Sequence, residues 1–141
     1  MHLDKRFEVR ASPEVCRSIL LEDEILIELF PDADNEIVGR SGTRKTVRSR
    51  YRALGQEGEA TFHFDTQPDG GVRFSKVCDG RVWKRLEGEV ALETRGQGTR
   101  VTLALDGSTK AFVPEFTIRA PMKDQLEQMA DALYRRMESA G

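Results

Sequence analysis

The sequence has few of the residues that commonly hold metals or act as nucleophile and base. It contains two cysteines, Cys16 and Cys78, and two histidines, His2 and His63. Two cysteines far apart in the chain cannot form a disulfide framework, and no metal-ligand spacing joins them to a histidine. We therefore expect two reduced thiols, no metal and no cofactor, as in an ordinary cytoplasmic protein.

The sequence also lacks a long apolar run and a strong excess of charge. No stretch approaches the ~18 apolar residues that a membrane-spanning helix needs, and the first residues lack the apolar segment of a signal peptide, so no membrane insertion is expected. The chain has 22 basic and 24 acidic residues, and its net charge of -2 gives no general attraction to nucleic acid or anionic membranes. Its length fits a single domain, 1–141, with one hydrophobic core.

The first 30 residues predict one strand and two short helices. Apolar and polar residues alternate over 3–9, which is typical of a half-buried strand. Ser12 can cap a helix and Pro13 suits its first position, so we predict a helix that ends at about Leu20. A second short helix follows at once and ends before Pro31, because proline cannot donate a backbone hydrogen bond.

The middle of the chain, from about 36 to 110, has a hydrophobic period of two and is interrupted by glycines. Runs of strand length lie between these glycines, for example 47–53, 60–65 and 86–93. Consecutive strands that are joined by short glycine turns form an antiparallel meander with one buried face and one exposed face.

The hairpin around Asp79 and Gly80 decides which side chains of its two strands face the core. A two-residue loop would put Phe74 on the same face as Arg85, so we predict a three-residue loop, 79–81, with a bulge. The inner face then has Val72, Phe74, Lys76, Val82, Lys84 and Leu86, and the outer face has Trp83.

The last segment is predicted to be a long amphipathic helix. Pro121 suits its first turn, and large apolar side chains recur after it at spacings of three and four. These side chains are Met122, Leu126, Met129, Leu133 and Met137. Burial of one such side chain contributes roughly 1.5–3 kcal/mol, so together they hold the helix firmly on the sheet. Phe112, Val113 and Phe116 should lead into the helix as an irregular or kinked segment.

The order of these elements, and two segments of the sequence, carry a resemblance to a known family. A strand, two short helices, a glycine-punctuated meander and a long helix resemble the helix-grip fold of the START-like (SRPBCC) superfamily, which includes the birch-allergen type and the polyketide cyclase/dehydrase and lipid-transport families. Residues 7–15 are similar to the family's opening strand and helix start, and residues 126–138 to its closing helix. The resemblance implies an α+β fold in which a curved antiparallel sheet of about seven strands wraps around the C-terminal helix. It also implies a cavity between helix and sheet for an apolar or amphipathic ligand.

The side chains on the inner faces of the sheet and the last helix are the candidate ligand-binding residues. They are Ser49, Tyr51, Phe62, Phe64, Phe74, Lys84 and Leu86 from the sheet, and Met122, Leu126, Met129 and Leu133 from the helix. A tyrosine or serine hydroxyl can orient a ligand carbonyl or hydroxyl, and an inward lysine suits a carboxylate or enolate. The alternatives are a solid core, and lysines that extend along the rim with their ammonium groups in water. His63 shares the phase of Thr61 and Asp65, which predicts a surface position.

A basic run without any acidic residue between Glu36 and Glu57 is the other prominent feature. Its members are Arg40, Arg44, Lys45, Arg48, Arg50 and Arg52. We favour a solvated outer strand face on which arginines lie opposite Glu59 and Asp65, because cross-strand pairs of opposite charge stabilise sheets. Nucleic-acid binding is the less favoured interpretation, because the aromatic residues that would stack on bases are assigned to the inner face.

The sequence thus supports three functions. The favoured one is binding of a lipid, isoprenoid or polyketide-like molecule without catalysis, because no catalytic constellation is present. The first alternative is a cyclase or dehydratase that uses a tyrosine, serine or lysine of the same cavity as general acid or base. The second is an interaction module that binds anionic partners through strand 44–52. The ligand and the oligomeric state, a dimer included, stay open.

Overall fold

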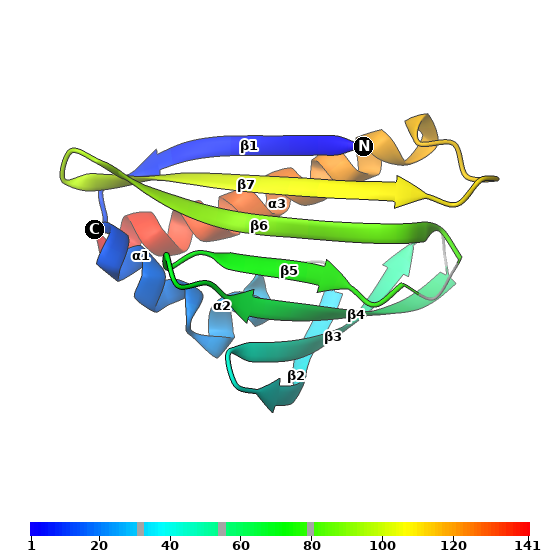
Figure 1. Ribbon diagram of the computed structural model, residues 1–141, viewed down its shortest axis with the longest axis horizontal. Helices are drawn as coiled ribbons and strands as arrows, with labels where there is room; N and C mark the ends of the chain where they lie inside the picture. Colours follow the sequence, from blue (N-terminus) through cyan, green and yellow to red (C-terminus); the bar gives the residue numbers. More distant parts are fainter. Residues whose placement is uncertain (31–32, 54–55, 79–80) are drawn as a thin grey trace.

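The computed structural model describes residues 1–141 except 31–32, 54–55 and 79–80. The elements are β1 (His2–Val9), α1 (Pro13–Leu20), α2 (Asp23–Glu28), β2 (Ala33–Ser41), β3 (Arg44–Ala53), β4 (Gln56–Thr66), β5 (Val72–Lys76), β6 (Trp83–Arg95), β7 (Gly98–Thr109) and α3 (Phe116–Ala140) (Figure 1). This arrangement confirms the predicted α+β helix-grip architecture.

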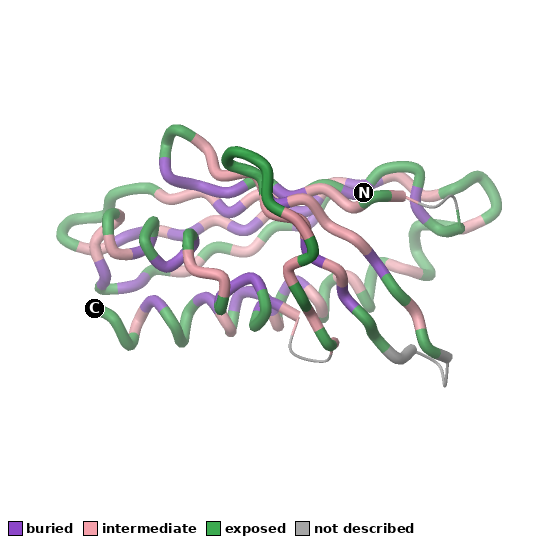
Figure 2. Tube along the Cα trace, turned by 90° about the horizontal axis from the view of Figure 1, so that it is seen from below, coloured by how far each residue is buried: buried purple, intermediate pink, exposed green. Residues whose placement is uncertain are grey.

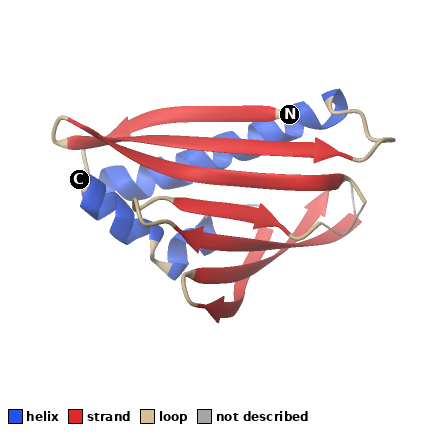
Figure 3. Ribbon diagram, in the orientation of Figure 1, coloured by secondary structure: helices blue, strands red, loops and turns tan. Residues whose placement is uncertain are grey.

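A single seven-stranded sheet runs through the described part of the chain, in the order β1-β7-β6-β5-β4-β3-β2. Each pair of neighbouring strands is antiparallel. The strands from β2 to β7 form the predicted meander, and β1 adds to the β7 edge. Figure 2 shows the sheet curving over α3, and Figure 3 shows the helices on one side of it. The inner face of the sheet is therefore the face that α3 covers.

The first helix starts as its sequence predicts. Ser12 is the N-cap of α1, and its side-chain oxygen accepts a hydrogen bond from the Val15 amide at 3.3 Å. Pro13 occupies the first helical turn, and the helix ends at Leu20. The predicted stop at Pro31 lies outside the described residues, and α2 itself ends at Glu28.

The start of α2 is tied to the sheet by one carboxylate. The Asp23 side chain accepts hydrogen bonds from Arg40 of β2 at 2.5 Å and from Lys45 of β3 at 2.9 Å. Arg40 and then Lys45 hold the pKa of the Asp23 carboxyl well below its ordinary value, because both favour the charged form. This anchor fixes α2 beside the β2–β3 edge and so positions the chain that follows it.

The C-terminal helix begins earlier than predicted. It starts at Phe116, and Pro121 lies inside it rather than in its first turn. At this interior position proline has no N–H to donate to the Thr117 carbonyl, and its ring crowds that carbonyl, which favours a local kink. Phe112 and Phe116 before it are 97% and 81% exposed, so the first turn of α3 extends beyond the core.

The hydrophobic core lies between α3, the two short helices and the inner face of the sheet. Leu126, Met129, Leu133 and Met137 of α3 are all buried in one cluster with side chains of the sheet. The helix face predicted from the spacing of three and four is therefore confirmed.

One part of the predicted sheet phase is wrong. Val72, Phe74 and Leu86 do share the inner face, since Val72 pairs with Val90 and Phe74 with Gly88. However, the β6–β7 register shifts between Trp83 and Arg85. Such a bulge inserts one extra residue and reverses the phase of the strand before it.

As a result, the side chains before the bulge exchange sides. Trp83 was predicted to face outward, but it is only 6% exposed and points into the interior. Val82 and Lys84 were predicted to face inward, but both are exposed. The predicted loop 79–81 includes residues outside the described part of the chain.

Candidate functional site

A pocket of about 270 Å³, here called the inner pocket, lies between the first half of α3 and the inner face of strands β3 to β7. It is lined by Phe30, Ala33, Ser49, Tyr51, Ala60, Phe62, Phe74, Lys76, Trp83, Leu86, Leu105, Pro121, Met122, Gln125 and Met129. Most of these side chains are aromatic or aliphatic. The pocket therefore offers an apolar surface with a few polar groups, which is the usual composition of a small-molecule site.

Four aromatic rings form a continuous row, and three of them, Phe30, Phe62 and Phe74, line the inner pocket. Phe30, which follows α2, stacks on Phe62 of β4 with ring centroids 5.3 Å apart. Phe62 contacts Phe64 at 6.4 Å, and Phe64 stacks on Phe74 of β5 at 5.4 Å. The strand register produces this row, because Phe64 and Phe74 are directly opposite each other.

Glycines define the positions of three rings, two further ones and that of Phe74 in the row. A side-chain carbon added at Gly58 would lie 2.5 Å from the ring of Tyr51, and one at Gly107 would lie 2.6 Å from the ring of Trp83. At Gly88 the added carbon would lie 2.2 Å from the ring of Phe74. Each ring thus packs directly on the backbone of a glycine. A larger residue at that position would clash with the ring. Rings that lie this close to the sheet leave room between the sheet and α3.

Most of the residues predicted for the site do line the inner pocket. They are Ser49, Tyr51, Phe62, Phe74, Leu86, Met122 and Met129. Phe64, Leu126 and Leu133 are instead buried in the solid part of the core. The prediction that Lys84 faces the cavity is wrong, because the bulge in β6 turns its side chain to the surface.

Several pocket residues were not among the predicted site residues. They are Phe30, Ala33, Ala60, Lys76, Trp83, Leu105, Pro121 and Gln125. Gln125 could have been found, because it lies three residues after Met122 and four before Met129 and so shares their helix face. Lys76 was predicted to face inward, and it does line the pocket. Phe30 could not have been found, because its position depends on how α2 is anchored.

Ser49, one of the predicted polar groups, has a structural partner. Its hydroxyl donates to the side-chain oxygen of Asn35 on β2 at 2.5 Å. The amide nitrogen of Asn35 in turn donates to the carbonyls of Ile27 at 2.8 Å and Phe30 at 3.0 Å. Asn35 therefore satisfies carbonyls at the end of α2 and holds the backbone of Phe30 beside the pocket. No pattern in the sequence indicated this role.

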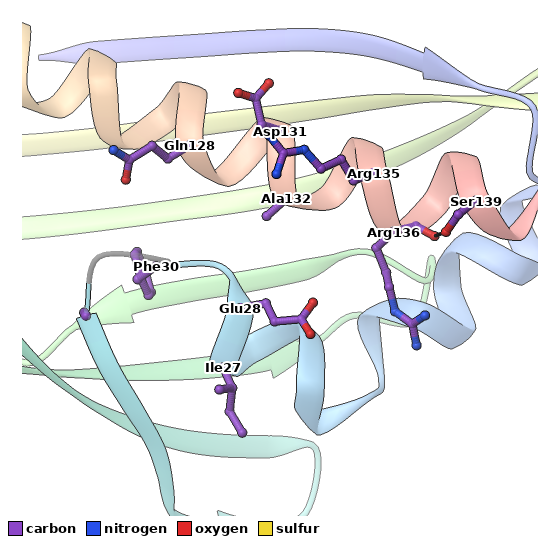
Figure 4. Close-up of a pocket in the computed structure, with 10 residues that line it drawn as sticks. Ile27, Glu28, Phe30, Gln128, Asp131, Ala132, Arg135, Arg136 and Ser139 are labelled. Carbon is purple, nitrogen blue, oxygen red and sulfur yellow. Dashed lines mark hydrogen bonds between the residues drawn. The ribbon is translucent and has the colours of Figure 1, made fainter.

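A second hollow, here called the helix groove, lies between α2 and the second half of α3 (Figure 4). Its volume is about 620 Å³, and it is lined by Ile27, Glu28, Phe30, Ala33, Gln128, Asp131, Ala132, Arg135, Arg136 and Ser139. Charged side chains of both signs border it, and Arg136 extends from α3 to pair with Glu22 at 2.5 Å. The groove shares Phe30 and Ala33 with the inner pocket. We favour the smaller inner pocket as the ligand site because its lining is apolar.

The basic strand face is occupied by ion pairs, as predicted. Arg44 lies opposite Asp65 and forms a salt bridge to it at 2.8 Å, while Arg50 lies opposite Glu59 at 3.9 Å. Arg48 pairs with Glu36 of β2. These cross-strand partners confirm the interpretation as a charge-compensated outer face. His63 lies on the same outer face, as its phase predicts, where it is partly buried and its Nδ1 is 2.9 Å from the hydroxyl of Thr46.

The described residues contain neither a candidate metal site nor a candidate membrane-spanning helix. No group of three or more histidine, cysteine, aspartate or glutamate side chains in this part of the chain could hold a metal ion. No helix among these residues has the length and apolar character needed to cross a membrane.

Comparison with solved structures identifies the fold. A protein from Thermus thermophilus has a TM-score of 0.80 and 21% identity, and the alignment covers 100% of this chain and 99% of the other. A START superfamily protein from Mycobacterium smegmatis has a TM-score of 0.77, 22% identity and 99% coverage of both chains. The Zhui aromatase/cyclase of a Streptomyces species has a TM-score of 0.74, 18% identity and coverage of 100% and 98%. The chain therefore has the helix-grip fold of START-like proteins.

No family model matches the chain, and no curated protein matches it significantly. The likeness to solved structures at such low identity concerns the fold, so the function has to be argued from the site.

Proposed function

We propose that the chain binds a small hydrophobic or amphipathic molecule in the inner pocket. The observation that carries the proposal is a space of about 270 Å³ walled by phenylalanine, tryptophan and methionine side chains. This volume lies just below the range of about 300–1,000 Å³ that is typical of drug-sized ligands. A medium-length hydrocarbon chain or a small ring system is therefore the expected size of the ligand.

The packing of α3 supports this proposal. Leu133 and Met137 in its second half have no exposed surface and pack in the solid core. In its first half, Met122 and Gln125 are only partly buried and line the pocket. The helix therefore closes the core at one end and leaves space over the sheet at the other. The fold neighbours described as a START superfamily protein and an aromatase/cyclase add support, because they share this architecture.

Trp83 provides a direct measurement of ligand binding. It is the one tryptophan of the chain and it lines the inner pocket. A ligand that enters the pocket changes the surroundings of its indole ring, so titration with decanol should produce a saturable change in tryptophan emission. Replacement of Ala60 by phenylalanine fills part of the pocket and should weaken decanol binding about tenfold or more, because two displaced methylenes at ~0.8 kcal/mol each suffice.

Ala104→Phe is the matched control for Ala60→Phe. Ala104 lies between Leu103 and Leu105 on β7, so its side chain points away from the pocket. This variant should bind decanol as the unmodified chain does. The proposal fails if decanol causes no saturable change in the emission of the unmodified chain, or if Ala60→Phe binds it equally well.

A cyclase-type or dehydratase-type enzyme is the second candidate. Tyr51 and Lys76 line the pocket and are the groups there that could act as general acid or base, and one fold neighbour is an aromatase/cyclase. If such turnover occurs with a β-hydroxycarbonyl substrate, Tyr51→Phe or Lys76→Met should lower kcat by about 10²–10⁴-fold. The exposed Lys84 gives the control variant Lys84→Met, which should leave kcat unchanged. Equal rates in all these variants would remove Tyr51 and Lys76 from the mechanism.

A further inference from the structure

Gln125 places an unsatisfied hydrogen-bond donor at the inner pocket. Its side chain shares the pocket-facing side of α3 with Met122 and Met129. The side-chain nitrogen of Gln125 is buried and has no hydrogen-bond partner. Such groups are uncommon in folded proteins, because a buried N–H without an acceptor loses its hydrogen bonds to water and gains none. An acceptor atom on a bound molecule would supply the missing hydrogen bond to the Gln125 side-chain nitrogen.

Lys76 adds a positive charge to the same pocket. It lies directly opposite Phe62 in the sheet and two residues after Phe74, so its side chain starts on the inner face. Among the described residues that line the pocket, it is the only charged one. The side chain is partly buried, and no carboxylate in the described part of the chain forms an ion pair with it.

The other polar side chains of the pocket need no such partner. The Ser49 hydroxyl already donates to Asn35. Tyr51 is 39% exposed, so water can reach it at the mouth of the pocket. The pocket therefore has one buried N–H donor without an acceptor and one positive charge without a carboxylate partner. An oxygen with negative charge satisfies both at once, because it accepts hydrogen bonds and pairs with an ammonium group.

We propose that the inner pocket selects amphipathic molecules that end in a carboxylate. The carboxylate accepts a hydrogen bond from the Gln125 side-chain nitrogen and pairs with the Lys76 ammonium. The hydrocarbon part packs against the rings of Phe62, Phe74 and Trp83. This inference rests on the ligand-binding function proposed above and adds the chemical class of the ligand to it.

Three probes of equal chain length test the selectivity: decanoate, decanol and decylamine, each titrated into the full chain at neutral pH and low salt. Binding is followed by Trp83 emission. Decanoate should bind about tenfold more tightly than decanol, as a close charge pair worth ~1.4 kcal/mol would produce. Decylamine should bind most weakly. Lys76→Met should reduce the affinity for decanoate to that for decanol, while the exposed control Lys84→Met should preserve the difference.

A second variant tests Gln125 without changing its shape. Gln125→Glu replaces the donor by a carboxylate that pairs with Lys76 itself, so the preference for decanoate over decanol should be lost. Equal affinity of the unmodified chain for decanoate and decanol would overturn the carboxylate proposal and leave the ligand-binding function standing. Unchanged preference for decanoate in both Lys76→Met and Gln125→Glu would also overturn it. If none of the three probes binds, the ligand-binding function fails together with this inference.

Discussion

Replacement of Gly88 by alanine is expected to weaken decanol binding about tenfold or more and to lower the free energy of unfolding by about 1–3 kcal/mol. The new methyl group would lie 2.2 Å from the ring of Phe74, closer than two carbon atoms can approach. Phe74 also stacks on Phe64, which is almost fully buried, so its ring cannot move toward that side. The open side is the inner pocket, and the displaced ring would take up volume that a ligand needs.

Gly39→Ala is the control for this prediction. Its added carbon would have Thr46 as nearest neighbour at 3.6 Å, which is ordinary van der Waals contact. We expect its stability to stay within about 0.5 kcal/mol of the unmodified chain, as for most surface substitutions, and its decanol affinity to be unchanged. Chemical denaturation and Trp83 titration measure the two quantities. If Gly88→Ala matches Gly39→Ala in both, Phe74 does not need the space above the Gly88 backbone.

Replacement of Leu133 by alanine should cause a larger loss of stability, about 2–5 kcal/mol. Leu133 is fully buried and is not itself part of the inner pocket lining. The truncated side chain leaves a cavity that the neighbouring residues of α3 and the sheet can fill only in part. Chemical denaturation gives the free energy of unfolding, and the folded fraction should still bind decanol with unchanged affinity.

The neighbouring Arg135 provides the comparison for Leu133. Arg135 is exposed, so Arg135→Ala should change the free energy of unfolding by about 0.5 kcal/mol or less. A loss below about 1 kcal/mol for Leu133→Ala would show that the second half of α3 is not packed as tightly as described. A loss of decanol affinity in the folded fraction would contradict the separation of core and pocket.

The α3 residues show how far sequence reasoning reached for the site. Spacings of three and four identified Met122, Leu126, Met129 and Leu133 as one helix face, which the structure confirms. The same spacings could not show that Leu126 and Leu133 belong to the solid core while Met122 and Met129 border a space. That difference depends on the distance between helix and sheet along the curved sheet, which no local pattern encodes.

Trp83 shows why a prediction of which strand residues face the core can be wrong. Period-two reasoning assigned β6 correctly from Leu86 onward and incorrectly before it, because the bulge between Trp83 and Arg85 adds a residue. The ring of Trp83 fits there because Gly107 on β7 leaves the backbone bare. The contact between Trp83 and Gly107 depends on the register of β6 against β7, so the sequence of β6 alone could not predict it.

The separation of core and pocket along α3 has a consequence for how this protein can change during evolution. Substitutions that alter ligand preference usually lower folding stability, because the residues of a binding site are packed less tightly than those of a core. Here Pro121, Met122 and Gln125 line the pocket and none is fully buried, while Leu133 and Met137 supply the buried contacts. One helix can therefore acquire a new specificity at its beginning and keep its folding free energy at its end.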